Sequence, residues 1–92
     1  MEALALSKRV RILNKRGLHA RASAKFVTLA SQFEANVLVS KDGSEVAGTS
    51  IMGLMMLAAA IGEEITINAS GQQAHEALAA LVDLVEAKFH EE

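Results

Sequence analysis

The spacing of apolar residues switches along the chain between a period of two and a helical period, and this switch restricts the possible folds most. From Lys8 to Leu13, basic residues alternate with Val10 and Ile12, a pattern typical of a half-buried strand. After His19 the apolar residues recur at intervals of three and four, which predicts a helix over 20–32. Its apolar face comprises Ala22, Phe26, Leu29, Ala30 and Phe33. The chain must therefore combine strands with helices.

Two short alternating segments, 36–40 and 44–47, are separated by Lys41, Asp42 and Gly43. An Asp-Gly pair favours the positive backbone angles of a tight turn between strands. We therefore expect these segments to form an antiparallel hairpin.

Three further elements complete the predicted order. Residues 50–61 form an apolar segment that predicts a short helix, and Gly62 is its stop signal. Residues 63–69 alternate again as a fourth strand, and 72–89 predict a long amphipathic helix. The order βαββαβα predicts an α+β domain in which helices cover one face of an antiparallel sheet. We expect the first and fourth strands to occupy the middle of that sheet.

Length and composition indicate one folded domain over residues 1–92. Half of the residues are hydrophobic and Pro is absent, which is typical of a compact core and not of a linker-rich chain. The absence of Cys excludes disulfides and thiolate chemistry. The longest apolar run, 51–61, is far shorter than the roughly 20 residues that span a bilayer. No signal peptide is apparent at the N-terminus, so we expect a cytoplasmic protein without membrane insertion.

The basic residues are concentrated in the first third of the chain. Residues 1–33 contain seven of the nine Lys and Arg residues and one acidic residue, whereas the net charge of the whole chain is -2. Such a segment attracts an anion or an acidic partner. A nucleic-acid-binding domain is a competing interpretation, but the acidic remainder and the absence of Tyr and Trp count against it. We therefore expect no nucleic-acid partner.

A histidine lies where the first strand gives way to the first helix. Gly17 provides flexible backbone for the turn, and His19 falls at the start of the helix, whose first N–H groups form an anion site. Arg21 can donate to phosphate oxygens. A free imidazole is largely neutral at pH 7, so it can attack phosphorus without first losing a proton. These features indicate phosphoryl chemistry at His19.

The competing interpretation is that His19 only caps the helix. Its basic and apolar flanks, with no Asp, Glu or second His nearby in the sequence, favour a phosphate-related role and argue against a metal site. We expect neither a metal nor a cofactor. His75 and His90 are interpreted as surface residues, with His90 at a frayed end of the chain.

Two segments carry a resemblance to a known family. The segment "GLHARAS" resembles the active-site signature of HPr, the phosphocarrier of the bacterial phosphoenolpyruvate-dependent phosphotransferase system, and "TSIMGLMMLAAAIGEEI" resembles its second signature. The resemblance implies an HPr-like open-faced β-sandwich. It also implies a stoichiometric carrier and not an enzyme: His19 would accept a phosphoryl group on Nδ1 from enzyme I and pass it to an EIIA-type protein, with Arg21 steadying the phosphate.

One residue departs from the usual signature of that family. The usual signature has a proline directly after the arginine, and this chain has Ala22 there instead. In this respect it resembles members of the nitrogen-related, NPr-like branch. Proline suits a first helical turn and alanine continues a helix well, so we expect transfer to persist. Sugar transport and nitrogen regulation both remain open as the pathway.

Ser50 and the apolar helix after it form a second candidate site. A serine at this position is a good helix cap, and the resemblance adds regulatory phosphorylation of Ser50 by HPr kinase/phosphorylase. By the same resemblance, Ile51, Met52 and Met55 form an exposed docking patch beside the histidine. A purely regulatory binding module that never phosphorylates His19 is the alternative, against which the retained His19 and Arg21 stand.

Overall fold

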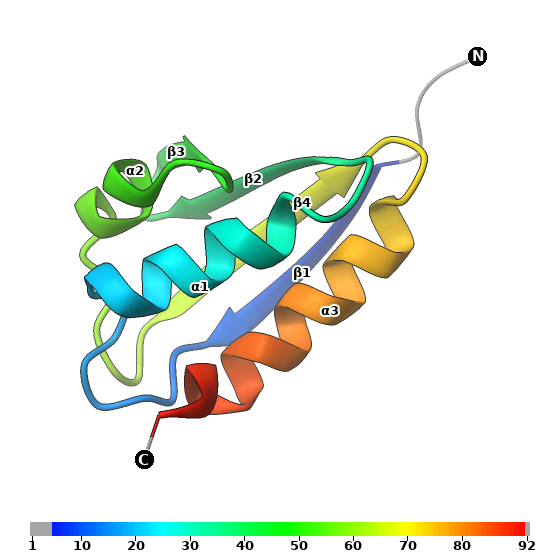
Figure 1. The fold of residues 1–92 in the computed structure, drawn as a ribbon. Helices are drawn as coiled ribbons and strands as arrows, with labels where there is room; N and C mark the ends of the chain where they lie inside the picture. The colour runs from blue at the N-terminus through cyan, green and yellow to red at the C-terminus, as the bar shows by residue number, and fades with distance from the viewer. Residues whose placement is uncertain (1–4, 92) are drawn as a thin grey trace.

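The computed structural model describes residues 5–91, and its elements follow the predicted order (Figure 1). A short 3-10 helix, η1, follows the last α-helix. The elements are β1 (Ala5–Arg11), α1 (Ala20–Ala30), β2 (Asn36–Lys41), β3 (Ser44–Ala47), α2 (Ile51–Met56), β4 (Glu64–Ser70), α3 (Ala74–Glu86) and η1 (Lys88–His90). No helix within this described range is both long enough and apolar enough to cross a bilayer.

The four strands form one antiparallel sheet in the order β1-β4-β2-β3. The expected interior position of the fourth strand is confirmed, but the expected interior position of the first is wrong, because β1 lies at an edge. Inward-facing Val10 would show the same alternation at an edge or in the middle, so the pattern does not distinguish them. The exposed Lys8, Arg9 and Arg11 were the available signal, because charged side chains protect an edge strand from pairing.

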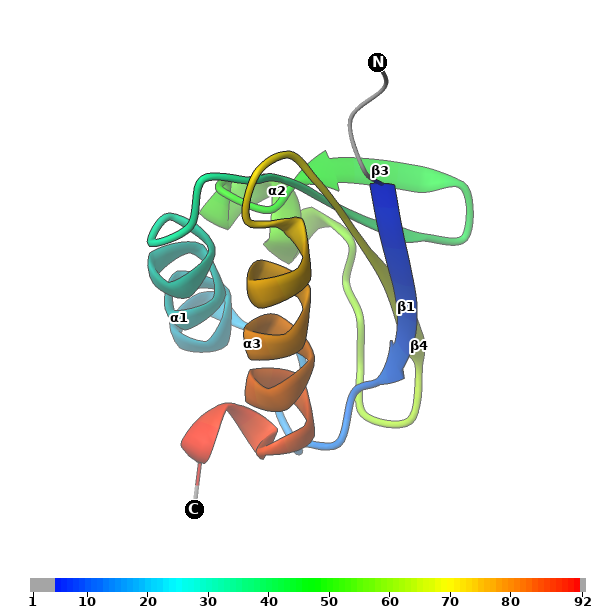
Figure 2. The same ribbon diagram turned by 90° about the vertical axis from the view of Figure 1, so that its right-hand side faces the viewer.

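The helices lie on one face of the sheet, as predicted, and the core fills the space between the two layers (Figure 2). The predicted apolar face of α1 is confirmed: Ala22, Phe26 and Ala30 are buried. The predicted hairpin is also present. Its turn residues Asp42 and Gly43 have φ of 51° and 86°, the positive values that a two-residue hairpin turn requires.

All three α-helices end earlier than the periodicity predicts. The first, α1, stops at Ala30 and not at 32, while α2 stops at Met56. Ala58 has a φ of 52°, so the backbone leaves the right-handed helical region there. The chain turns at this point, and Ala59 is buried in the core.

The predicted helix over 72–89 is wrong at its C-terminal end. Helix α3 ends at Glu86, after which Lys88, Phe89 and His90 have φ of 57°, 54° and 58°. The expectation of a frayed end is also wrong, because the Phe89 side chain is fully buried. Lys25 Nζ donates a 2.7 Å hydrogen bond to the Phe89 carbonyl. We call residues 88–91 the C-terminal turn.

Candidate functional site

Gly17 lets the loop before α1 pack tightly against the segment after α2. Its φ is +61°, and a Cβ atom there would lie 2.2 Å from the Ala59 carbonyl oxygen, so both the conformation and the space require glycine. The next residue, Leu18, donates a backbone hydrogen bond of 3.0 Å to the same oxygen. This contact fixes the backbone immediately before His19.

His19 is the N-cap of α1. Its backbone is extended, with φ -74° and ψ -177°, and its Nδ1 accepts a 3.1 Å hydrogen bond from the Ala22 N–H. The His19 carbonyl accepts the first helical hydrogen bond, from the Ser23 N–H at 2.9 Å. The predicted location at the helix start is therefore confirmed. Histidine here satisfies a helix donor that is usually satisfied by Ser, Thr, Asp or Asn.

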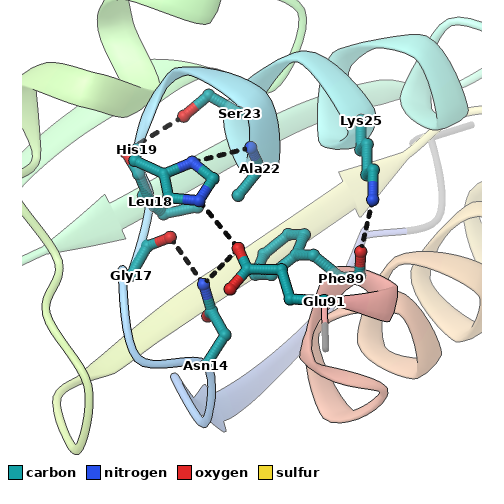
Figure 3. A network of polar contacts seen from close by, with 9 residues as sticks. All are labelled: Asn14, Gly17, Leu18, His19, Ala22, Ser23, Lys25, Phe89 and Glu91. Atoms are coloured by element: carbon teal, nitrogen blue, oxygen red, sulfur yellow. Dashed lines mark hydrogen bonds and ion pairs between the residues drawn. The ribbon is translucent and has the colours of Figure 1, made fainter.

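The other ring nitrogen of His19 contacts a carboxylate from the far end of the chain (Figure 3). Nε2 lies 2.7 Å from Oε1 of Glu91, and each of the two side chains is 18% exposed. Asn14 Nδ2 donates to the same Glu91 oxygen at 3.0 Å and to the Gly17 carbonyl at 2.8 Å. Both imidazole nitrogens are therefore occupied, and only the tautomer with its proton on Nε2 satisfies both contacts.

The expectation that no acidic group lies near His19 was wrong. Only residues close to His19 in the sequence entered that prediction, whereas the C-terminal turn brings Glu91 to the His19 ring from the other end of the chain. No periodic pattern indicated this turn, because three successive non-glycine residues with positive φ have no sequence signature. No group of three His, Cys, Asp or Glu side chains in residues 5–91 is arranged to hold a metal ion.

The basic residue predicted to steady a phosphate lies on the first turn of α1. Arg21 is exposed and has no ion pair or side-chain hydrogen bond within residues 5–91. It lines a shallow groove together with Lys25 and His90. An exposed guanidinium without an internal partner can reach a group on the surface. Because His19 caps α1 and Arg21 is its second residue, both lie at the N-terminal end of this helix.

Ala22 contributes a donor that proline cannot. Its side chain is fully buried, and its N–H points to Nδ1 of His19. Proline has no N–H, so a chain with the usual signature residue would lack this hydrogen bond. The departure from the family pattern therefore changes the polar surroundings of the ring nitrogen and not merely the helix propensity.

Ser50 is the N-cap of α2, as predicted. Its Oγ accepts a 2.9 Å hydrogen bond from the Gly53 N–H. The predicted patch residues are exposed, with Ile51 at 40%, Met52 at 71% and Met55 at 42%. Sequence reasoning left out Met56, which is 78% exposed. We extend the docking patch to include Met56, so that it comprises Ile51, Met52, Met55 and Met56.

The two leucines of this region belong to the core, as expected. Leu54 is fully buried and Leu57 is 6% exposed. Helix α2 packs beside α1 (Figure 1), so the docking patch and the His19 cap belong to neighbouring helices. His75, by contrast, is an exposed residue near the start of α3.

Comparisons with known proteins agree with this geometry. Residues 6–87 match the family model described as the PTS HPr component phosphorylation site. The phosphocarrier protein HPr of Neisseria meningitidis serogroup A is 52% identical over 86 residues, which cover 94% of this chain and 97% of that protein. The phosphocarrier protein NPr of Shewanella violacea is 43% identical over 86 residues, 94% of each chain. The crystal structure of an HPr from Thermoanaerobacter tengcongensis has a TM-score of 0.90 at 45% identity and covers 95% of this chain and 98% of that one.

The fold and these relatives define a small phosphocarrier domain of the open-faced β-sandwich class. The chain belongs to the HPr family of the phosphoenolpyruvate-dependent phosphotransferase system. The resemblance drawn from the two motifs is thereby confirmed, and family membership supports a phosphocarrier role.

Proposed function

We propose that this protein is a stoichiometric carrier that accepts a phosphoryl group from phosphorylated enzyme I on Nδ1 of His19 and donates it to an EIIA-type protein. The observation that carries the proposal is the His19 cap itself. Its contacts leave the lone pair on Nδ1, and that nitrogen faces a helix N–H group. A phosphoryl group bonded to Nδ1 would therefore lie beside backbone N–H donors at the positive end of the α1 dipole.

The transfer step needs no group beyond the two proteins. The Nδ1 lone pair forms a bond to phosphorus while the bond from phosphorus to the donor breaks, and that electron pair leaves with the donor. The proton on Nε2 stays on the ring throughout. Donation to the acceptor repeats the exchange in reverse, which restores the starting tautomer. His19 is thus loaded and unloaded once per cycle, which is carriage and not catalytic turnover.

The hydrogen bond between Ala22 and His19 must open before the attack. Nδ1 cannot bond phosphorus while its lone pair accepts the Ala22 N–H. Breaking one such bond costs about 1 kcal/mol, which is small beside a reaction barrier. The released Ala22 N–H can then donate to a phosphate oxygen, and Arg21 can add a charge-assisted hydrogen bond. In this proposal the cap donor changes its acceptor from nitrogen to phosphate.

The docking patch is proposed to receive both partners in turn. Flexible Met side chains adapt to differently shaped surfaces, and the patch residues are exposed next to the helix that positions His19. A phosphate on Ser50 would place a double negative charge beside Ile51 and Met52. We propose that phosphorylation by HPr kinase/phosphorylase acts there, by weakening docking and not by unfolding α2.

The wider cellular setting follows from this carrier role. A relay with enzyme I implies a cytoplasmic protein, and we propose that residues 1–92 act as one domain. Relatives named HPr and NPr both match the chain, so sugar transport and nitrogen regulation are both retained as pathways. A regulatory module that never carries phosphate could use His19 only as the cap of α1, a role that Ser, Thr, Asp or Asn usually fills.

The test uses labelled phosphoenolpyruvate with enzyme I. We expect one acid-labile, base-stable phosphate per chain, and none in His19→Ala. His75→Ala serves as the matched control because His75 is an exposed histidine on another element, and this variant should accept label normally. Label that persists in His19→Ala would overturn the assignment.

A further inference from the structure

We propose that Glu91, held by Asn14, is a positioning residue that fixes the tautomer of His19. The proposal deepens the carrier function and rests on it. Glu91 lies beyond residues 6–87, which the family model matches, and the sequence motifs did not indicate it. The three side chains form one connected network (Figure 3).

The contact between Glu91 and His19 has the features of a tautomer lock. At 2.7 Å between Nε2 and Oε1 it is a short, charge-assisted hydrogen bond, and both side chains are mostly shielded from solvent. A carboxylate only accepts hydrogen bonds, so it selects the tautomer with the proton on Nε2. The lone pair is then on Nδ1, the nitrogen that must attack phosphorus.

The same contact favours the charge that develops during transfer. When Nδ1 shares its lone pair with phosphorus, positive charge builds up on the ring. A carboxylate bonded to Nε2 stabilises that charge, in the way that carboxylates orient and activate catalytic or metal-binding imidazoles. Glu91 therefore acts on the ring in two ways, by holding the proton and by supplying a negative charge.

Asn14 holds the carboxylate in place at the expense of its own oxygen. Its side chain is 2% exposed, and its Nδ2 donates to both Glu91 and Gly17. Its Oδ1 is buried without a hydrogen-bond partner within the described part of the chain. Turning the amide over would direct that oxygen at two acceptors, so the orientation is fixed.

The backbone that delivers Glu91 is also unusual. Lys88, Phe89 and His90 have left-handed φ values, a strained conformation for residues with side chains. Burial of Phe89 and the hydrogen bond from Lys25 stabilise the turn. The turn directs Phe89 into the core and brings Glu91 to the His19 ring. The same strained backbone therefore produces the contact between Glu91 and His19.

The experiment reads the tautomer directly and in the absence of any partner. The full chain with nitrogen-15-labelled histidine is compared by NMR for the wild type, Glu91→Ala, Glu91→Gln and Glu86→Ala. Glu86 is the matched control, since it is an exposed carboxylate at the end of α3. Transfer rates from phosphorylated enzyme I and thermal unfolding are measured on the same samples.

We expect the wild type and Glu86→Ala to carry the ring proton on Nε2. In Glu91→Ala only the Ala22 N–H still favours that tautomer, so the fraction with the proton on Nδ1 should rise above the wild-type value and transfer should slow roughly tenfold, as expected when one charge-assisted contact is lost. In Glu91→Gln the Asn14 donor keeps the amide oxygen facing the ring, so the tautomer should persist while the transfer rate falls between the other two.

An unchanged tautomer in Glu91→Ala would overturn the proposal, and so would a changed tautomer with an unchanged transfer rate. If Glu91→Ala unfolds, the Glu91→Gln variant still decides, because a loss of its Nε2–H tautomer contradicts the proposed role of Asn14. Failure of the carrier function itself would appear separately, as label on a residue other than His19.

Discussion

The N-termini of α1 and α2 use the same capping geometry for different purposes. His19 Nδ1 accepts from the N–H three residues later at 3.1 Å, and Ser50 Oγ does the same at 2.9 Å. Around His19, Glu91 contacts the other ring nitrogen of the cap, and Arg21 lies on the first turn of the same helix. Around Ser50, the neighbours are exposed and apolar. The difference shows that what a cap can do depends on its surroundings and not on the cap bond.

The largest expected effect is that of a charge at the Ser50 cap. Ser50→Asp should slow phosphorylation of His19 by roughly a hundredfold, because leaving a charge unpaired in an interface costs about 2–5 kcal/mol. Aspartate is itself a good N-cap, so the melting temperature should stay nearly unchanged or rise slightly. The measurement pairs transfer rate with thermal unfolding.

Ser50→Ala is the control for that comparison. It removes the cap without adding charge, so it should lower stability by about 1 kcal/mol while transfer stays close to wild type. If Ser50→Asp transferred phosphate as fast as wild type, Ser50 would be only a helix cap. A large fall in its melting temperature would instead attribute any slow transfer to damage to the fold.

Arg21→Ala tests the charged neighbour that the Ser50 cap lacks. Hydrogen bonds to charged groups contribute about 1.5–3 kcal/mol, so transfer should slow by at least about tenfold with the fold intact. Arg16→Ala is the matched control, because Arg16 is an exposed arginine on the loop before α1. Equal rates in the two variants would reduce Arg21 to a solvated side chain.

Ala22→Pro tests the donor that the His19 cap uses. The substitution removes the N–H that bonds Nδ1, which frees the nucleophile but also removes a later phosphate donor. These effects oppose each other, so we expect the transfer rate to stay within about tenfold, or 1.4 kcal/mol. Stopped-flow transfer from phosphorylated enzyme I measures it. Complete loss would show that the Ala22 N–H is essential in this chain.

His90→Gly tests the strained turn that gives only the His19 cap a second partner. Glycine adopts a φ of 58° without steric penalty, so this change should raise stability by about 0.5–1 kcal/mol. His75→Gly is the contrast, because glycine is a poorer helix former than histidine and should lower stability by a few tenths of a kcal/mol. Urea unfolding separates the two directions. A destabilised His90→Gly would show that the His90 side chain, and not its backbone, matters.

The sequence predicted the two caps but not what surrounds them. Helical periodicity and the His19 and Ser50 positions follow from local patterns, and so does the hairpin turn at Asp42 and Gly43. The edge position of β1 and the contact with Glu91 depend on which distant segments meet. Local propensity carries little information on such pairings, since tertiary packing of Phe89 overrides the helical pattern of residues 87–89.

The central claim is that Nδ1 of His19 is the phosphoryl acceptor, and one measurement tests it most directly. The chain, labelled with nitrogen-15 in histidine, is phosphorylated by enzyme I and phosphoenolpyruvate and studied by NMR in alkaline buffer, where phosphohistidine is stable. We expect a phosphorus–nitrogen coupling at Nδ1 of His19 and none at Nε2. Coupling at Nε2, or a phosphate on any other residue, would contradict the account.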